Sequence, residues 1–582
     1  MEINDREASK NQEGAATDQA LSRRGFMRLA AGGALAGAVG LPFLLDACGG
    51  TAQVSGGASS GGAAGSASAA SSGAAKAAAL KLPTYVPFVG PKPDFAPSAD
   101  GVVPPGYLTY PKDLAKFTKG PVGKGDDVSV FTYEINPPPT AADQNPAWQQ
   151  INKDLGVNLK FTNVALQDYN TKLSTVIAGG DLPDLFSMNV LDVLIPNELE
   201  FFESRAADLT PYVSGDAIKE YPNLANFPPL AWKSTVFNGK IFALPRVTNG
   251  VGSAMIVQQN LMDEAGVKEF KNVDDFTKFM QAVTKQGQWG IGGVKANTMQ
   301  WMLGVFRAPN NWKESGGKFT KDWETEEYKE AVAYLRKLWD LKVVSPDTPT
   351  FIAQQGAAKF YAGKFAMYPT DFFAFDIAWQ RLLGINKNFK LNGVVEFGHD
   401  GGKGTHFQNK GIVQIAVLKK SSPDRIKELL GVANYLSAPF GTQEKLGLDF
   451  GVKSVDYNLN DKGNPHRTKK GISDVQYSPW GTIINGPQVL FDGESPESTK
   501  VAYPIESAAH EIAVTDPTIG LYSATDAAKR AILTQKVWDA VDAIIFGRSP
   551  VSSLDQVVKD WRSGGGDQIR SEMGKAFEKA SK

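Results

Sequence analysis

From residue 126 onward, short apolar runs alternate with stretches whose apolar residues recur at helical spacing. Apolar runs predict strands, and amphipathic spacing predicts helices. The expected strands cover 128–133, 157–161, 185–186, 240–244 and 412–418. The expected helices cover 148–155, 169–178, 274–285, 326–340, 353–361, 423–436 and 528–545. Strands that alternate with helices predict an α/β fold with a largely parallel sheet.

The N-terminus has a different pattern. Residues 22–28 contain paired arginines, Arg23 and Arg24, and resemble a twin-arginine export motif. The weakly apolar stretch 29–45 that follows is typical of a signal peptide and short for a permanent span. It ends in Leu45-Asp46-Ala47-Cys48, which resembles a lipobox, although Asp46 replaces the usual small or apolar residue. We therefore expect 1–48 to be a twin-arginine lipoprotein signal peptide with Cys48 lipidated.

The next segment contains few residues that could build a core. Residues 49–80 are almost all Gly, Ala and Ser, and 81–125 are rich in Pro and Gly. Such compositions are typical of flexible or extended tethers. The sequence predicts a flexible linker over 49–125. Its second half is expected to be an extended arm that can pack partly on the folded body.

Composition limits the number of lobes, the class of partner and the possible covalent links. A chain of 582 residues is too long for one ordinary core, so at least two lobes are expected. Its 42% hydrophobic and 21% charged residues are typical of a globular protein. A net charge of −1 argues against nucleic acid as a partner. Cys48 is the single cysteine, so no disulfide can form within the chain.

Several motifs, in this order, resemble a known family. They are Ala178–Phe186 (AGGDLPDLF), Phe237–Pro245 (FNGKIFALP), Asn260–Val267 with Val273–Phe276, Phe360–Tyr368 (FYAGKFAMY), and Asn434–Ser437 with Phe450–Val452. By these motifs the chain resembles the extracellular solute-binding proteins of ABC importers, in the branch of sugar- and oligosaccharide-binding lipoproteins.

The resemblance implies a two-lobed periplasmic-binding-protein fold of type II, with a hinge and an interlobe ligand cleft. Lobe 1 would comprise 126–246 and 411–480, and lobe 2 would comprise 247–410 and 481–582. The chain is expected to cross between lobes near 246–251 and to return near Gly401–Gly404. The implied protein is a monomer without enzymatic activity, anchored outside the cytoplasm by lipid on Cys48. It would deliver an oligosaccharide, or another small solute, to an ABC permease.

Candidate ligand-binding residues follow from strand ends and predicted crossings, where α/β sheets bind ligands. Sugar recognition combines aromatic faces with polar groups for the hydroxyls. The candidates are Tyr133, Glu134, Ser187, Asn189, Arg246, Trp301, Tyr368, Asp371, Phe372 and Trp480. Each of them could instead have a core, turn or capping role.

Two alternatives stay open. A secreted hydrolase of carbohydrates would need paired carboxylates, and no pair is marked by a motif. The four histidines, His399, His406, His466 and His510, lack metal-ligand spacing, so neither a metal nor another cofactor is expected. A binder of peptides or other solutes is the second alternative, because the sequence does not identify the ligand.

Overall fold

The computed structural model describes residues 80–118, 120–134, 138–188, 198–293, 295–351 and 353–581. These residues belong to one compact unit. The predicted signal peptide, Cys48 and the candidate Asn189 lie outside the described residues. Within the described residues, none of the helices has the length and apolar character needed to cross a membrane.

The first sheet has five strands in the order β3-β2-β4-β15-β7. They are β2 (Asp127–Glu134), β3 (Asn158–Ala165), β4 (Leu185–Met188), β7 (Ala243–Val247) and β15 (Ile412–Leu418). β2 is parallel to β3 and β4, whereas β15 is antiparallel to both β4 and β7. The predicted strands are confirmed, and the sheet is mixed because one strand enters it from the returning chain.

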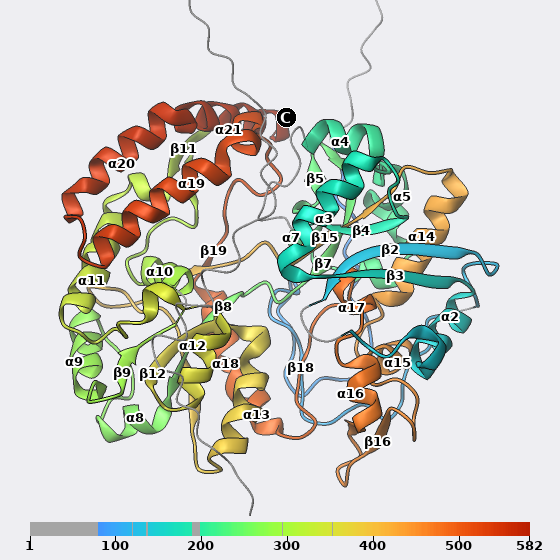
Figure 1. Ribbon diagram of the computed structural model, residues 1–582, viewed down its shortest axis with the longest axis horizontal. Helices are drawn as coiled ribbons and strands as arrows, with labels where there is room; N and C mark the ends of the chain where they lie inside the picture. Colours follow the sequence, from blue (N-terminus) through green and yellow to red (C-terminus); the bar gives the residue numbers. More distant parts are fainter. Residues whose placement is uncertain are drawn as a thin grey trace, which may run out of the picture. The chain divides into compact units, whose positions relative to one another are not determined.

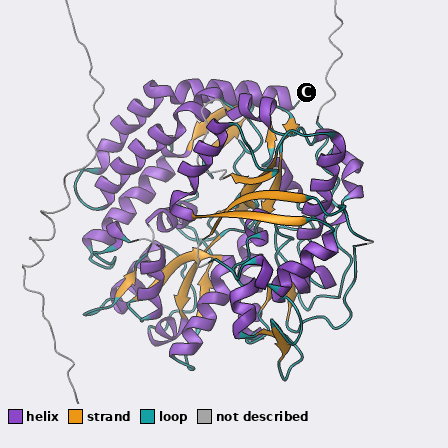
Figure 2. Ribbon diagram, turned by 45° about the vertical axis from the view of Figure 1, so that its right-hand side comes forward, coloured by secondary structure: helices purple, strands orange, loops and turns teal. Residues whose placement is uncertain are grey.

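Helices cover this sheet and share one core with it (Figures 1 and 2). They include α2 (Pro146–Leu155), α3 (Leu166–Gly179), α14 (Pro423–Leu436), α15 (Gln443–Phe450), α16 (Lys469–Val475) and α17 (Trp480–Ile483). α2 begins where Asn145 accepts a hydrogen bond from the Trp148 amide, and it ends at Gly156, whose φ is 67°. A polar cap and a left-handed glycine are the usual signals that begin and end a helix.

A tight turn leads into β7. β5 (Val236–Phe237) and β6 (Lys240–Ile241) form a hairpin around Asn238 and Gly239, with φ of 49° and 79°. Positive φ at both central residues is typical of the Asn-Gly hairpin turn. The predicted turn is confirmed, and the predicted strand after it is divided between β6 and β7.

The second sheet has four strands in the order β13-β8-β12-β9. They are β8 (Ser253–Gln258), β9 (Trp289–Ile291), β12 (Phe365–Asp371) and β13 (Leu391–Val394). β8 is antiparallel to β12 and β13, and β12 is parallel to β9.

The second sheet contributes to two further cores, which also include helices. The principal helices are α9 (Val273–Val283), α10 (Lys295–Val305), α11 (Glu326–Asp340), α12 (Ala353–Tyr361), α13 (Phe375–Ile385), α18 (Pro496–Glu511), α19 (Ala524–Ile545), α20 (Leu554–Trp561) and α21 (Asp567–Ala580). The last three pack on one another and form the red layer in Figure 1. Each sheet therefore has its own hydrophobic surroundings, as expected when a long chain divides its core.

Two passages that join the sheets lie side by side. The first is 248–252, between β7 and β8, and the second is 408–411, before β15. The Thr248 amide donates to the Gly411 carbonyl at 3.0 Å, and the Asn409 amide donates to the Gly250 carbonyl at 3.2 Å. The predicted return near Gly401–Gly404 is therefore wrong, because the chain returns at 408–411. Gly401 and Gly402 instead shape a turn in which the Gly398 amide donates to the Gly402 carbonyl at 2.8 Å.

Residues 80–118 form the predicted extended arm, and they pack on the folded body, so this described part of the predicted linker is not flexible. Residues 49–79 lie outside the described residues. The Thr84 amide donates to the Gly215 carbonyl at 3.0 Å. Further on, Phe95 stacks on Tyr503 of α18, and β1 (Gly106–Tyr107) pairs with β18 (Leu490–Phe491). Aromatic residues within the proline-rich segment supply apolar area that its composition as a whole does not suggest.

Tyr110 is the centre of the aromatic contacts of this arm. Its ring lies 4.8 Å from Phe440, 5.9 Å from Phe450 and 5.4 Å from Phe491. We expect Tyr110→Ala to lower the free energy of unfolding by about 3 kcal/mol, the usual cost of deleting a buried ring. Urea denaturation measures this loss, with Val89→Ala as control because Val89 is 95% exposed. A loss no larger than that of the control would contradict a packed arm.

Candidate functional site

The candidate site lies at the carboxyl edge of the first sheet, where β2, β3, β4 and β7 end. These four strands run in the same direction, because β15 is antiparallel to the two strands that it joins. Open α/β sheets bind ligands at this edge. Tyr133 and Glu134 end β2, Ser187 lies in β4, and Arg246 lies near the end of β7.

Arg246 joins three chain segments at this edge. Its Nη1 donates to the Tyr133 hydroxyl at 3.1 Å, and its Nε donates to the Gly481 carbonyl of α17 at 2.8 Å. Burial lowers the pKa of the Arg246 guanidinium, but from so high a value that it stays charged. Among the described residues, none accepts a hydrogen bond from Nη2. The guanidinium thus has a donor available for a ligand.

Ser187 belongs to a buried cluster of hydroxyl groups. Its Oγ lies 3.0 Å from the Thr132 Oγ1, which also lies 3.0 Å from the Thr482 Oγ1. Ser187 and Thr132 are fully buried. Ser187 therefore holds α17 against the sheet, and we expect its effect on a ligand to be indirect.

Unpaired hydrogen-bond acceptors lie on the strands that carry these groups and next to α17. Within the described part of the chain, the buried oxygens without a partner include Glu134 Oε2 of β2, Asn163 Oδ1 of β3, Gln414 Oε1 of β15 and Asn485 Oδ1 after α17. Gln414 is paired with Arg246 across β15 and β7, and Asn163 is paired with Thr132 across β3 and β2. Leaving a buried acceptor unpaired costs about 1–3 kcal/mol. This arrangement suits a ligand with many hydroxyl donors.

The structure adds four residues to the candidates that the sequence analysis selected: Asn163, Gln414, Thr482 and Asn485. None of them belongs to a motif, and Thr482 and Asn485 lie in a part of the chain with no recognisable pattern. Only β3 and β15, which were predicted, could have drawn attention to Asn163 and Gln414.

Three aromatic residues that were predicted to bind the ligand lie in the hydrophobic core instead. Trp301 is 2% exposed, lies between Phe276 and Phe397, and donates from Nε1 to the Val394 carbonyl. Trp480 is also 2% exposed and donates from Nε1 to the Leu448 carbonyl. Phe372 is buried in the core of the second sheet. These rings lie against apolar neighbours, so we no longer expect them to contact a ligand.

The remaining candidates lie on β12 of the second sheet. Tyr368 is buried, and its ring stacks on Phe360 with centroids 5.7 Å apart, so it too packs in the core. Asp371 ends the strand opposite Ser253, and burial raises the pKa of its carboxyl group. Of the candidates on the second sheet, Asp371 is thus the one with a partly accessible polar group at a strand end.

Lys410 adds a charge at the second passage between the sheets. Burial, followed by the charge of Arg530, lowers the pKa of its ammonium group. Glu198, at the start of α4 (Glu198–Arg205), is close enough to act on Lys410, and burial raises the pKa of Glu198.

Across the described part of the chain, no group of three or more His, Cys, Asp or Glu side chains could hold a metal ion.

Comparison with known proteins identifies the family. The family model described as bacterial extracellular solute-binding protein matches residues 147–438, half of the chain. The chain belongs to this family. It is a solute-binding protein, and its two sheets with separate cores agree with the two-lobed α/β architecture of its structural neighbours.

Two relatives from Bacillus subtilis (strain 168) align over most of this solute-binding protein. The polygalacturonan/rhamnogalacturonan-binding protein YtcQ is 25% identical over 470 residues, covering 78% of this chain and 91% of its own. Lipoprotein LipO is 24% identical over 482 residues, covering 78% and 93%. The crystal structure of the alginate-binding protein AlgQ2 without calcium ion superimposes with a TM-score of 0.59 at 14% identity, covering 80% and 100%. At that identity the likeness concerns the fold.

The acceptor at the end of β2 can be tested directly. Glu134→Gln replaces one carboxylate oxygen by an amide donor of the same shape, so a ligand hydroxyl loses its acceptor. We expect ligand affinity to fall about tenfold, a loss typical of one hydrogen bond to a charged group. Isothermal titration calorimetry measures the affinity, with Glu203→Gln on the exposed face of α4 as control. Equal affinities of the two variants would remove Glu134 from the site.

Proposed function

We propose that this protein is the lipid-anchored substrate-binding subunit of an ABC importer and captures an oligosaccharide at the carboxyl edge of the first sheet. The observation that carries the proposal is the pairing of Arg246 and Tyr133 beside several buried, unpartnered acceptor oxygens. A sugar ring presents hydroxyl groups that both donate and accept, so it can satisfy acceptors such as Glu134 Oε2 and donors such as Arg246 Nη2.

The relatives support carbohydrate as the ligand class. The name of YtcQ describes a polygalacturonan/rhamnogalacturonan-binding protein, and AlgQ2 is described as alginate-binding. A solved structure of the substrate-binding protein FusA with kestose has a TM-score of 0.56 to this chain at 15% identity. Delivery to an ABC permease, a monomeric state and the absence of catalysis are parts of the same proposal.

Membrane attachment rests on the sequence around Cys48. A diacyl group on this cysteine would anchor the protein stably outside the cytoplasm, because two chains bind a bilayer far better than one. We expect Cys48→Ser to shift the protein from the membrane fraction to the soluble fraction, measured by immunoblotting after fractionation. Ser55→Ala, outside both the export motif and the lipobox, is the control. Continued membrane association of Cys48→Ser would refute lipid anchoring.

Thermal-shift measurements test the ligand class. The protein lacking residues 1–48 would be heated with neutral and acidic oligosaccharides, among them oligogalacturonides, alginate oligosaccharides and fructo-oligosaccharides. A ligand that binds the folded state raises the melting temperature. The proposal predicts a rise with at least one oligosaccharide, recovered intact by chromatography. No rise with any of them, with a rise for peptides instead, would favour the peptide alternative, and cleavage would favour a hydrolase.

A further inference from the structure

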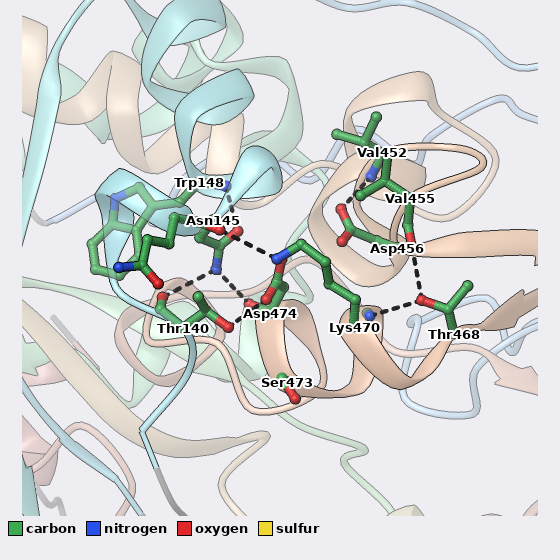
Figure 3. A network of polar contacts seen from close by, with 12 residues as sticks. Thr140, Asn145, Trp148, Val452, Val455, Asp456, Thr468, Lys470, Ser473 and Asp474 are labelled. Carbon is green, nitrogen blue, oxygen red and sulfur yellow. Dashed lines mark hydrogen bonds and ion pairs between the residues drawn. The ribbon is translucent and has the colours of Figure 1, made fainter.

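Two fully buried carboxylates, Asp456 and Asp474, belong to one network of polar contacts (Figure 3). Asp474 accepts hydrogen bonds from the Thr140 hydroxyl at Oδ1 and from Lys470 Nζ at Oδ2, the latter at 2.7 Å. Asp456 Oδ2 accepts from the Val452 amide at 2.8 Å. The Asp474 charge acts directly on Asp456. Lys470 Nζ bonds to Asp474 from a partly exposed side chain, and its charge also acts on Asp456.

Asp474 and its neighbours in α16 fasten the chain that follows β2. The Thr140 amide donates to the Ser473 carbonyl at 3.1 Å, and the Asn145 Nδ2 donates to the Asp474 carbonyl at 3.0 Å. Lys470 Nζ also donates to the Gln144 carbonyl at 3.2 Å. Among the described residues, the Asp474 carboxylate accepts the bond from the Thr140 hydroxyl, and the other bonds between 140–145 and α16 end on main-chain carbonyls. This loop leads back to Glu134 at the end of β2.

A continuous series of contacts runs from Asp474 to Arg246. The Thr140 hydroxyl donates to the Asp474 carboxylate, and the Thr140 carbonyl accepts from Asn145 Nδ2 at 3.3 Å. Asn145 in turn accepts at Oδ1 from the Trp148 amide at 3.0 Å. The Trp148 ring lies edge-on against Trp480, with centroids 6.0 Å apart. Trp480 begins α17, whose Gly481 carbonyl accepts from Arg246 Nε. The position of the Arg246 guanidinium thus depends on the loop that Asp474 holds.

We propose that Asp474, paired with Asp456, is a positioning residue that holds the loop after β2 and α17 in the geometry required for ligand binding. The inference rests on the proposed function, because it assigns a role at the same site. Neither carboxylate is hydrogen-bonded to the candidate ligand groups, so Asp474 acts through Thr140, Asn145 and α17.

Protonation of Asp456 makes this positioning role dependent on pH. Burial and the nearby Asp474 charge raise the pKa of Asp456, although the Val452 amide opposes this shift. Neutral Asp456 can therefore donate a hydrogen bond to Asp474. When Asp456 loses its proton at higher pH, the two neighbouring anions repel each other.

Other charged groups around the pair are already engaged or lie on neighbouring helices. Lys445 and Asp449 of α15 pair at 3.0 Å, and Arg467 donates to the Asp449 carbonyl. α2 contributes Lys153 and Asp154. Lys470 is thus the cation bonded directly to the pair within the described residues.

The experiment compares Asp474→Asn with Asp456→Asn in the protein lacking residues 1–48. The asparagine of Asp456→Asn imitates the neutral acid, because its oxygen can accept from Val452 while its amide donates to Asp474. We expect this variant to keep its ligand affinity. The affinity of the wild type should change with pH above the usual pKa of an aspartate, and the variant should lose most of this change. Asp474→Asn removes the anion that binds Lys470, and we expect its affinity to fall about tenfold. The probe is the oligosaccharide with the largest thermal shift.

Hydrogen exchange separates failure of this inference from failure of the proposed function, because it needs no ligand. In Asp474→Asn, amides of 138–145 and 480–485 should exchange faster while those of β8 and β12 stay unchanged. Thr140→Val, which deletes one donor to Asp474, should show a smaller change in the same direction if Asp474→Asn does not fold. Unchanged exchange at both segments, or identical pH profiles of the wild type and Asp456→Asn, would overturn the inference. A wild type that binds no oligosaccharide would refute the proposed function alone.

Discussion

Replacing Arg246 by lysine is expected to weaken oligosaccharide binding about 100-fold, although the positive charge is retained. The guanidinium bridges the Tyr133 hydroxyl and the Gly481 carbonyl with two different nitrogens. A single ammonium cannot reach both groups and also donate to a ligand, because its donors radiate from one atom. Isothermal titration calorimetry of the purified Arg246→Lys variant measures the loss.

Arg336→Lys provides the matched control for this prediction. Arg336 pairs with Asp340 on the surface of α11, and its partner carboxylate is half exposed. Such surface pairs contribute little to stability, and this one belongs to a helix outside the first sheet. If Arg246→Lys bound the ligand as tightly as Arg336→Lys does, the guanidinium would not be part of the binding site.

The stability of the protein is expected to fall as the pH rises from about 4.5 to 8, chiefly through Glu506. Burial raises the pKa of this carboxyl group from 4.5 to about 8. A raised pKa means that the folded state holds a proton which the unfolded state releases, so stability is lost with increasing pH. The slope for one proton is about 1.4 kcal/mol per pH unit, and guanidinium denaturation at a series of pH values measures it.

Glu506 is hydrogen-bonded to the first passage between the two sheets. Its Oε2 accepts from Asn249 Nδ2 at 2.6 Å, and Asn249 belongs to the first passage between the sheets. Nearby, His406 donates to the Val251 carbonyl and pairs with the buried Glu396. Burial acts to lower the pKa of His406, but the charge and hydrogen bond of Glu396 outweigh it, so the pKa is raised. Stability from His406 is present below its ordinary pKa and is also lost as the pH rises.

Glu506→Gln should remove most of this pH dependence, because glutamine keeps the bond to Asn249 and cannot release a proton. Glu497→Gln, at the exposed start of the same helix, should leave the slope unchanged. Parallel slopes for the wild type and Glu506→Gln would show that Glu506 is ionised in the folded protein at neutral pH.

Local signals predicted individual elements well. The predicted bounds of α11, α12, α14 and β15 agree with the structure. α11 and α14 have clear beginnings, because Thr325 and Ser422 accept hydrogen bonds from amides of their first turns. The insertion of antiparallel β15 between β4 and β7 could not be predicted, since it depends on a chain that returns after more than a hundred intervening residues.

The site was predictable only in part. Tyr133 was selected at the end of a predicted strand and Arg246 at the predicted crossing between lobes, and the structure brings them together through a hydrogen bond. Trp301, Phe372 and Trp480 were selected for their aromatic character, which does not reveal the face on which a ring lies. Thr482 and Gln414 reach the site through the position of α17 and the pairing of β15 with β7, and both depend on tertiary packing. The ligand role of these residues stays a prediction.

The most direct test of the account is a calorimetric titration of the protein lacking residues 1–48 with the oligosaccharide that stabilises it most. The account predicts saturable binding of one oligosaccharide per chain, with the sugar recovered unchanged after prolonged incubation. Absence of binding heat at any temperature, or steady conversion of the sugar to shorter products, would contradict a role in capture and delivery.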